Sequence, residues 1–188
     1  MKRSVLAVSC LAVVVPAAAA LAQQACPMEM NVPAMTLGDM YTKAEAKAKA
    51  WKPDVVLSRI TNTSMGPLDE KGRSEAWNID FYSPSTKQLL TISTFRGMFN
   101  CYAMDGDGGR LPDLKPGFFR DGAKLYAIAK AKGGGLVEKG FQIMVGTAAA
   151  PETRHATWNI SFSKDNANAG PLILVDANTG AVEKVITN

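Results

Sequence analysis

Trp77-Asn78-Ile79-Asp80-Phe81 recurs later in the chain as Trp158-Asn159-Ile160-Ser161-Phe162. An Ala-Lys-Ala-Lys segment precedes each copy, at residues 46–49 and at residues 129–132. Either match alone is short enough to arise by chance, but two matches in the same order and at nearly the same spacing indicate a duplicated unit. We therefore expect both tryptophans to begin equivalent strands and to be buried there.

The first unit is predicted to begin with a helix. Apolar residues recur at helical spacing between residues 37 and 51. Thr36 and Asp39 resemble a capping box at the start of this run, and Pro53 stops it. The following residues 77–82 alternate apolar and polar side chains, which is the period of a half-buried strand.

The second unit follows the same plan. Its helix ends at the triple glycine 133–135, where left-handed backbone conformations have no steric cost. Strands are predicted after it, and Asn178-Thr179-Gly180 forms the last hairpin turn. The predicted fold class is therefore α+β, with two tandem units that each pack a helix on a small antiparallel β-sheet.

The chain divides into four predicted segments. Residues 1–22 form a signal peptide, residues 23–96 the first unit with an N-terminal extension, residues 97–117 a linker, and residues 118–188 the second unit. Glycines and prolines in the third segment favour the linker. Its Asp105–Gly109 stretch invites a calcium loop, but an EF-hand needs glutamate where Pro116 stands, so a glycine turn is favoured.

The N-terminus has the pattern of a secretory signal. Lys2 and Arg3 precede an apolar run over residues 5–15, and Ala20-Leu21-Ala22 is a small-x-small cleavage pattern. Cleavage after Ala22 is favoured over an uncleaved membrane anchor. We therefore expect an exported protein, periplasmic or secreted, with no membrane contact after cleavage.

Charge argues against a nucleic-acid partner. The 188-residue chain has a formal net charge of +4, and cleavage leaves 19 cationic side chains against 17 anionic ones. The remaining lysines are scattered, whereas binding a polyanion needs a concentrated basic face.

The cysteines predict a disulfide. Cys10 leaves with the signal, so Cys26 and Cys101 remain in an oxidising compartment. Their bond would stabilise the fold by about 4 kcal/mol through loop closure. Two free thiols or a thiolate metal site are the alternatives, and lipidation of Cys26 is disfavoured by the preceding Gln23 and Gln24.

The C-terminal hairpin carries a family resemblance. Residues 172–182 contain Asp176-Ala177-Asn178-Thr179-Gly180 between two apolar strands, and a strand that opens with Trp158 precedes them. This pattern resembles the end of a PepSY domain, and the second unit is the clearer match. The resemblance implies a helix on a small antiparallel sheet, in exported proteins that bind or restrain hydrolases without catalysis. A tandem of such units is also similar in architecture to β-lactamase inhibitory protein.

Catalytic motifs are absent from the sequence. It contains no HExxH, no Gly-x-Ser-x-Gly and no phosphate-binding glycine loop. The single histidine, His155, is interpreted as a surface residue at a strand end rather than a general base. We expect no enzyme activity and no cofactor, although four carboxylates leave an acid pair open: Asp69, Glu70, Glu75 and Asp80.

The expected function is that of an exported, non-catalytic binding module, which restrains or inhibits a co-exported hydrolase or peptidase. If the helices cover one face of the sheet, the opposite face is the candidate surface for the protein partner. An aromatic among small polar groups is typical of an interface core. The predicted partner-binding residues are Asn78, Asp80, Tyr82, Asn159, Ser161 and Ser163.

Two other function classes remain open. One is a periplasmic copper-binding protein with soft sulfur ligands from cysteine and methionine. Its candidate methionines, which also suit a core, are Met28, Met30, Met35, Met40, Met98 and Met104. The other is an unrecognised hydrolase.

Overall fold

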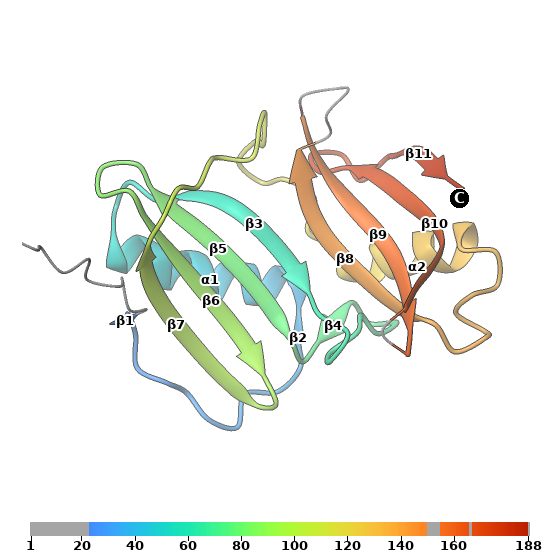
Figure 1. The fold of residues 1–188 in the computed structure, drawn as a ribbon, viewed down its shortest axis with the longest axis horizontal. Helices are drawn as coiled ribbons and strands as arrows, with labels where there is room; N and C mark the ends of the chain where they lie inside the picture. Colours follow the sequence, from blue (N-terminus) through green and yellow to red (C-terminus); the bar gives the residue numbers. More distant parts are fainter. Residues whose placement is uncertain (1–22, 150–154, 166, 188) are drawn as a thin grey trace, which may run out of the picture.

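A computed structural model describes residues 23–149, 155–165 and 167–187 (Figure 1). The predicted signal peptide, residues 1–22, lies outside the described residues. The elements in chain order are β1 (Gln23–Gln24), β2 (Met35–Thr36), α1 (Leu37–Trp51), β3 (Val56–Asn62), β4 (Arg73–Ser74), β5 (Trp77–Ser83), β6 (Gln88–Phe95), β7 (Met98–Asp105), α2 (Gly122–Lys132), β8 (Gln142–Ala149), β9 (Ala156–Lys164), β10 (Ala167–Asp176) and β11 (Val182–Ile186).

Nine strands form a single antiparallel sheet. Their order is β1-β7-β6-β5-β3-β8-β9-β10-β11, and β2 and β4 form a separate two-stranded sheet. The first half of the sheet consists of β1, β7, β6, β5 and β3, and the second half of β8, β9, β10 and β11. Figure 1 shows both helices behind this sheet, with α1 behind the first half and α2 behind the second. The apolar core therefore lies between the helices and one face of the sheet.

The predicted fold class of two tandem helix-on-sheet units is wrong. The protein is mostly β, and its helices span only 15 and 11 residues. The two halves share one sheet because β3 pairs with β8, where Thr61 lies opposite Gly146. Separate units would each expose an edge strand at this point, and pairing the two edges removes those unpaired backbone groups from solvent.

Part of the segment predicted as a linker also belongs to the sheet. Strand β7 begins at Met98 and pairs with β6 over its whole length, from Phe95 opposite Met98 to Gln88 opposite Asp105. Its apolar side chains at Phe99 and Cys101 are buried in the core. The connection between the halves therefore starts only after β7, where the glycines begin.

The local sequence correctly predicts both ends of α1 and the C-terminal end of α2. At the start of α1, Oγ1 of Thr36 accepts a hydrogen bond from the Asp39 backbone N–H at 3.2 Å and donates to Oδ2 of Asp39 at 2.7 Å. The backbone N–H of Lys52 caps the other end, just before Pro53. Helix α2 ends at Gly133, the first glycine of the triple-glycine run.

The two tryptophans are fully buried, as predicted. Each indole Nε1–H donates to a backbone carbonyl in the segment that enters a helix. Trp77 donates to Met35 before α1, and Trp158 donates to Phe119 before α2, both at 2.9 Å. Each tryptophan thus hydrogen-bonds the segment before a helix to a strand of the sheet.

The predicted disulfide between Cys26 and Cys101 is confirmed. Cys101 lies in β7 and is buried. The N-terminal segment runs beside this strand, with Gln23 opposite Ala103 and Glu29 bridged to Phe99. The covalent bond therefore holds this segment against the edge of the sheet.

The junction between the halves depends on the side chain of Asn62, which is only 3% exposed. Its Oδ1 accepts from the Val145 backbone N–H at 2.7 Å, and its Nδ2 donates to the Ile143 carbonyl at 3.3 Å and to the Gly66 carbonyl at 3.2 Å. The amide therefore bonds the backbone of β8 as a neighbouring strand would. A side chain of β8 also bonds the backbone of β3, since Oγ1 of Thr147 accepts a hydrogen bond from the Ile60 N–H at 2.8 Å.

Replacing Asn62 with alanine should lower the free energy of unfolding by about 1–3 kcal/mol, because it leaves buried backbone groups of β8 without partners. Chemical denaturation followed by tryptophan fluorescence measures the change. The matched control is Asn168→Ala, an exposed asparagine expected to change stability by less than about 0.5 kcal/mol. Equal stability of the two variants would contradict the role of Asn62.

Replacing both Cys26 and Cys101 with alanine should lower stability by about 4 kcal/mol, since the bond closes a loop over a sequence separation of 75 residues. Denaturation under non-reducing conditions measures the loss. Wild-type protein in reductant serves as the control and should approach the stability of the variant. If the oxidised wild type is no more stable than the variant, the disulfide does not contribute as argued.

Candidate functional site

The predicted partner-binding residues lie on the face of the sheet opposite the helices. They occupy two strands, β5 and β9, which β3 and β8 separate. Asn78 and Asn159 lie in one row across the sheet, through Thr61 and Gly146. The structure therefore places the six residues on one face but in two groups.

None of these six side chains is fully exposed to solvent. Asp80 is 7% exposed, and its carboxylate receives Arg59 Nε at 2.8 Å and Thr91 Oγ1 at 2.8 Å. Ser163 is buried as well. Asn78, Tyr82, Asn159 and Ser161 are half-buried. Because Asp80 is already paired within the sheet, its charge is not available to a partner.

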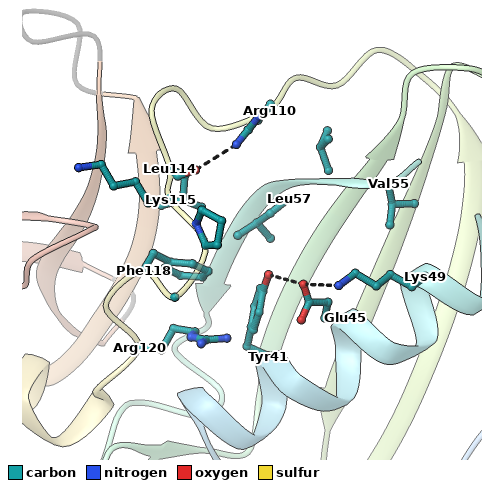
Figure 2. Close-up of a pocket in the computed structure, with 13 residues that line it drawn as sticks. Tyr41, Glu45, Lys49, Val55, Leu57, Arg110, Leu114, Lys115, Phe118 and Arg120 are labelled. Carbon is teal, nitrogen blue, oxygen red and sulfur yellow. Dashed lines mark hydrogen bonds and ion pairs between the residues drawn. The ribbon is translucent and has the colours of Figure 1, made fainter. Parts of the chain in front are cut away.

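A cavity of about 520 Å³ lies on the other side of the molecule, between α1, the start of β3 and the connection between the halves (Figure 2). Apolar side chains line part of it, among them Leu57 and Leu114. Its charged lining residues are four cations and one acid: Lys49, Arg110, Lys115, Arg120 and Glu45. We call this cavity the cationic pocket.

Arg120 is the cation of the pocket that contacts two aromatic rings. Its guanidinium carbon lies 4.7 Å from the ring centroid of Tyr41 and 5.1 Å from that of Phe118. These two rings meet edge to face at 5.0 Å. Cation–π contact with aromatic faces attracts a guanidinium and leaves its N–H donors for other partners. Among the described residues, no carboxylate forms an ion pair with Arg120, although it is half-buried.

The acid of the pocket is already neutralised. Oε1 of Glu45 accepts a hydrogen bond from the Tyr41 hydroxyl at 3.2 Å and lies 3.0 Å from Lys49 Nζ. Burial, with the nearby Glu45 carboxylate, raises the pKa of Tyr41 to about 12, although Arg120 opposes this shift. The pocket therefore keeps an excess of positive charge.

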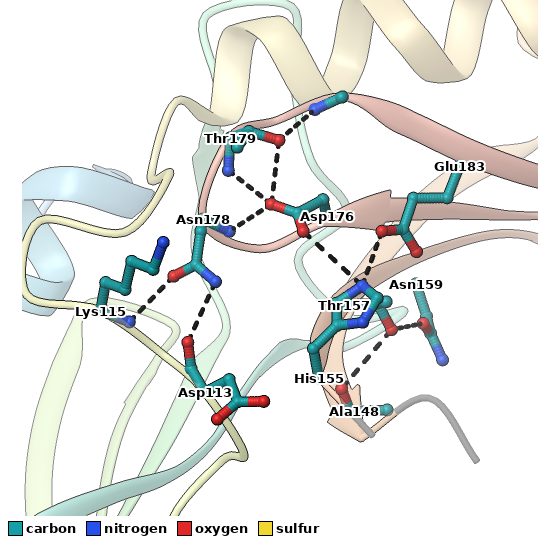
Figure 3. Close-up of polar contacts among 11 residues, drawn as sticks. Asp113, Lys115, Ala148, His155, Thr157, Asn159, Asp176, Asn178, Thr179 and Glu183 are labelled. Atoms are coloured by element: carbon teal, nitrogen blue, oxygen red, sulfur yellow. Dashed lines mark hydrogen bonds and ion pairs between the residues drawn. The ribbon is translucent and has the colours of Figure 1, made fainter. Parts of the chain in front are cut away.

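The wall of the pocket opposite α1 is held by the C-terminal hairpin turn (Figure 3). Oδ1 of Asn178 accepts from the Lys115 backbone N–H at 2.9 Å, and its Nδ2 donates to the Asp113 carbonyl at 3.1 Å. Arg110 Nη2 donates to the Leu114 carbonyl at 3.1 Å within the same connection. The Asn178-Thr179-Gly180 turn, which the sequence predicts as a hairpin, thus positions one wall of the cationic pocket.

A second polar group surrounds His155 (Figure 3). Its Nε2 lies 2.6 Å from Glu183 Oε1 and 3.6 Å from Asp176 Oδ2. Burial alone would raise the pKa of Asp176, but hydrogen bonds from Thr179 and Asn178, together with His155, outweigh it and lower this pKa. The sequence singled out His155, and it missed both carboxylates because they are distant along the chain.

The other sequence candidates do not gather into a site. Asp69 pairs with Arg73, while Asp80 pairs with Arg59. Within the described part of the chain, His155, Asp176 and Glu183 are the one group of three or more His, Cys, Asp or Glu side chains close enough to share a metal ion. The Asp105–Gly109 stretch therefore shows no calcium cluster among the described residues.

Comparisons with known proteins show the fold alone. No family model matches the chain, and no curated protein matches it. Among solved structures, the chain is similar to a protein from Clostridium difficile 630 described as a "putative lipoprotein", with a TM-score of 0.50 and 13% sequence identity. The match covers 85% of this chain and 95% of that one.

Over the described residues, neither helix is long and apolar enough to cross a membrane.

Replacing Tyr41 with phenylalanine should remove one phenol that ionises near pH 12. The difference in absorbance at the tyrosinate band between wild type and variant measures this titration. Because the unfolded phenol ionises near pH 10 and the folded one near pH 12, the wild type should lose stability over that interval as pH rises. A weaker loss is expected in the variant, and identical pH dependence of the two proteins would contradict the burial of Tyr41 beside Glu45.

Proposed function

We propose that the protein is an exported, non-catalytic binding protein, and that the cationic pocket holds an acidic segment of a partner protein. The observation that carries this proposal is Arg120, a half-buried guanidinium in cation–π contact with two aromatic rings and with no carboxylate partner among the described residues. Burying a cation without a counter-charge is unfavourable. An acidic ligand supplies the missing charge.

The chemistry of the Arg120 guanidinium suits a carboxylate. A guanidinium presents a planar fork of N–H donors that matches the two oxygens of Asp or Glu. Arg110 and Lys115, at the mouth of the same pocket, also form no ion pair with a described residue. Three cations with no ion pair among the described residues line this one cavity, and such a charge excess attracts an anion and speeds its association.

The apolar lining favours a peptide over a simple anion. Leu57 and Leu114 are buried beside the cavity, and Val55 and Pro116 extend the apolar wall. A volume of about 520 Å³ suits a ligand that combines apolar and charged groups. Acidic side chains flanked by apolar ones meet both requirements.

The class of partner rests on resemblance. The Asp176–Gly180 hairpin is similar to that of PepSY domains, whose members bind or restrain hydrolases, and we propose a secreted hydrolase or peptidase as the partner. Export is supported by the N-terminal signal pattern and by the description of the similar solved structure as a "putative lipoprotein".

The disulfide removes both cysteines from the ligand set of the copper alternative. The sulfur atoms of Cys26 and Cys101 are bonded to each other and are not thiolate ligands. Met40 is fully buried in the core beneath α1, while Met28 and Met30 are exposed. Copper binding by the methionines stays a prediction.

Arg120→Gln should weaken binding of acidic peptides at least about tenfold, the effect of losing about 1.4 kcal/mol from a charge-assisted contact. The probes are fluorescein-labelled peptides that combine Asp or Glu with Leu or Phe, measured by fluorescence polarisation. The same peptides with Asn and Gln in place of the acids should bind weakly. Binding of the acidic set should weaken as salt rises.

Two variants serve as controls. Arg96→Gln removes a matched cation, which lies 5.0 Å from the Phe95 ring and outside the pocket, and it should leave binding unchanged. Tyr82→Ala tests the open face of the sheet. Equal binding of acidic and neutral peptides, or a loss in Tyr82→Ala with none in Arg120→Gln, would overturn the assignment to the cationic pocket.

A further inference from the structure

Three strands bring potential metal ligands together at one end of the second half of the sheet. His155 directly precedes β9, Asp176 ends β10, and Glu183 lies in β11. One ligand atom of each residue lies within 4.8 Å of the other two. Because the three residues sit on or beside paired strands, their backbones are held in place by the sheet.

Asp176 is oriented by the hairpin turn that follows it. Its Oδ1 accepts three hydrogen bonds, from the Asn178 N–H at 2.9 Å, the Thr179 N–H at 2.6 Å and the Thr179 hydroxyl at 2.9 Å. This leaves Oδ2 directed at the imidazole, as Figure 3 shows. Outer hydrogen bonds of this kind orient carboxylate ligands in metal sites.

We propose that Nε2 of His155, Oδ2 of Asp176 and Oε1 of Glu183 form a Zn²⁺ site. Zn²⁺ binds imidazole nitrogen and carboxylate oxygen at about 2.0–2.2 Å, which places neighbouring donors about 3.3 Å apart in a tetrahedron. The two distances from Nε2, 2.6 Å and 3.6 Å, lie on either side of that value. Small side-chain rotations therefore open the hydrogen bond between His155 and Glu183 enough to admit the ion.

The donor set selects the kind of cation. One imidazole and two carboxylates suit Zn²⁺, whereas Ca²⁺ takes six to eight oxygen ligands and Mg²⁺ keeps near-octahedral oxygen geometry. Three protein ligands also leave a fourth position on Zn²⁺ for water or a ligand group. The site lies outside the cationic pocket and does not depend on the proposed function.

The test uses the fact that the chain contains a single histidine. Tag-free protein is dialysed against chelator and titrated with Zn²⁺ while the ring signals of His155 are followed by ¹H–¹⁵N NMR. The Nε2 signal should shift and saturate at one equivalent. Ca²⁺ and Mg²⁺ should leave it unchanged.

Calorimetry with variants separates a metal site from a plain ion pair. Glu183→Gln, which keeps the side-chain size, should weaken Zn²⁺ binding at least about tenfold, and Thr179→Ala should weaken it about tenfold by releasing Asp176. Glu138→Gln, an exposed acid paired with Lys130 elsewhere, should bind Zn²⁺ as the wild type does. Unchanged imidazole signals at saturating Zn²⁺, or equal affinity of Glu183→Gln and wild type, would overturn the proposal.

Discussion

The buried amide of Asn62 reinforces the strand contact that joins the two halves of this molecule. β3 and β8 share one residue pair, Thr61 with Gly146, and the side chain of Asn62 extends this short contact by bonding the β8 backbone at two points. Unpaired backbone groups in the core are costly, so the amide and the two strands stabilise one another. The β3–β8 contact makes the sheet continuous across both halves.

The cationic pocket follows from how the halves are joined. The chain must pass from β7 at one side of the sheet to α2 in the other half, and this connection crosses beside α1 and the start of β3. Asn178 fastens it from the second half through Lys115 and Asp113. Phe118 then packs between Tyr41 of the first half and Trp158 of the second, so that the ring beneath Arg120 belongs to the common core. The placement of the charge thus depends on contacts from both halves.

Sequence reasoning succeeded where the signal was local. The capping pattern of Thr36, the stop at Gly133 and the alternation in β5 and β9 each depend on neighbouring residues, and all three are present in the structure. The disulfide followed from the two cysteines that remain after removal of the predicted signal peptide. It failed for β7, because the glycines that follow this strand favour a linker that begins too early. It did not single out the cationic pocket, because Tyr41, Arg120 and Glu45 match no motif.

The sequence by itself determined the ends of both helices, the strands β5 and β9 with their buried tryptophans, and the cysteine pair. Capping and periodicity are set by neighbouring residues, and the cysteine pair follows from composition. Only the tertiary structure decided that the halves share one sheet, that Arg120 lies on two aromatic rings, and that Asp176 and Glu183 converge on His155. These contacts join residues that are distant along the chain. Their geometry arises from packing and strand register, which leave no local pattern in the sequence.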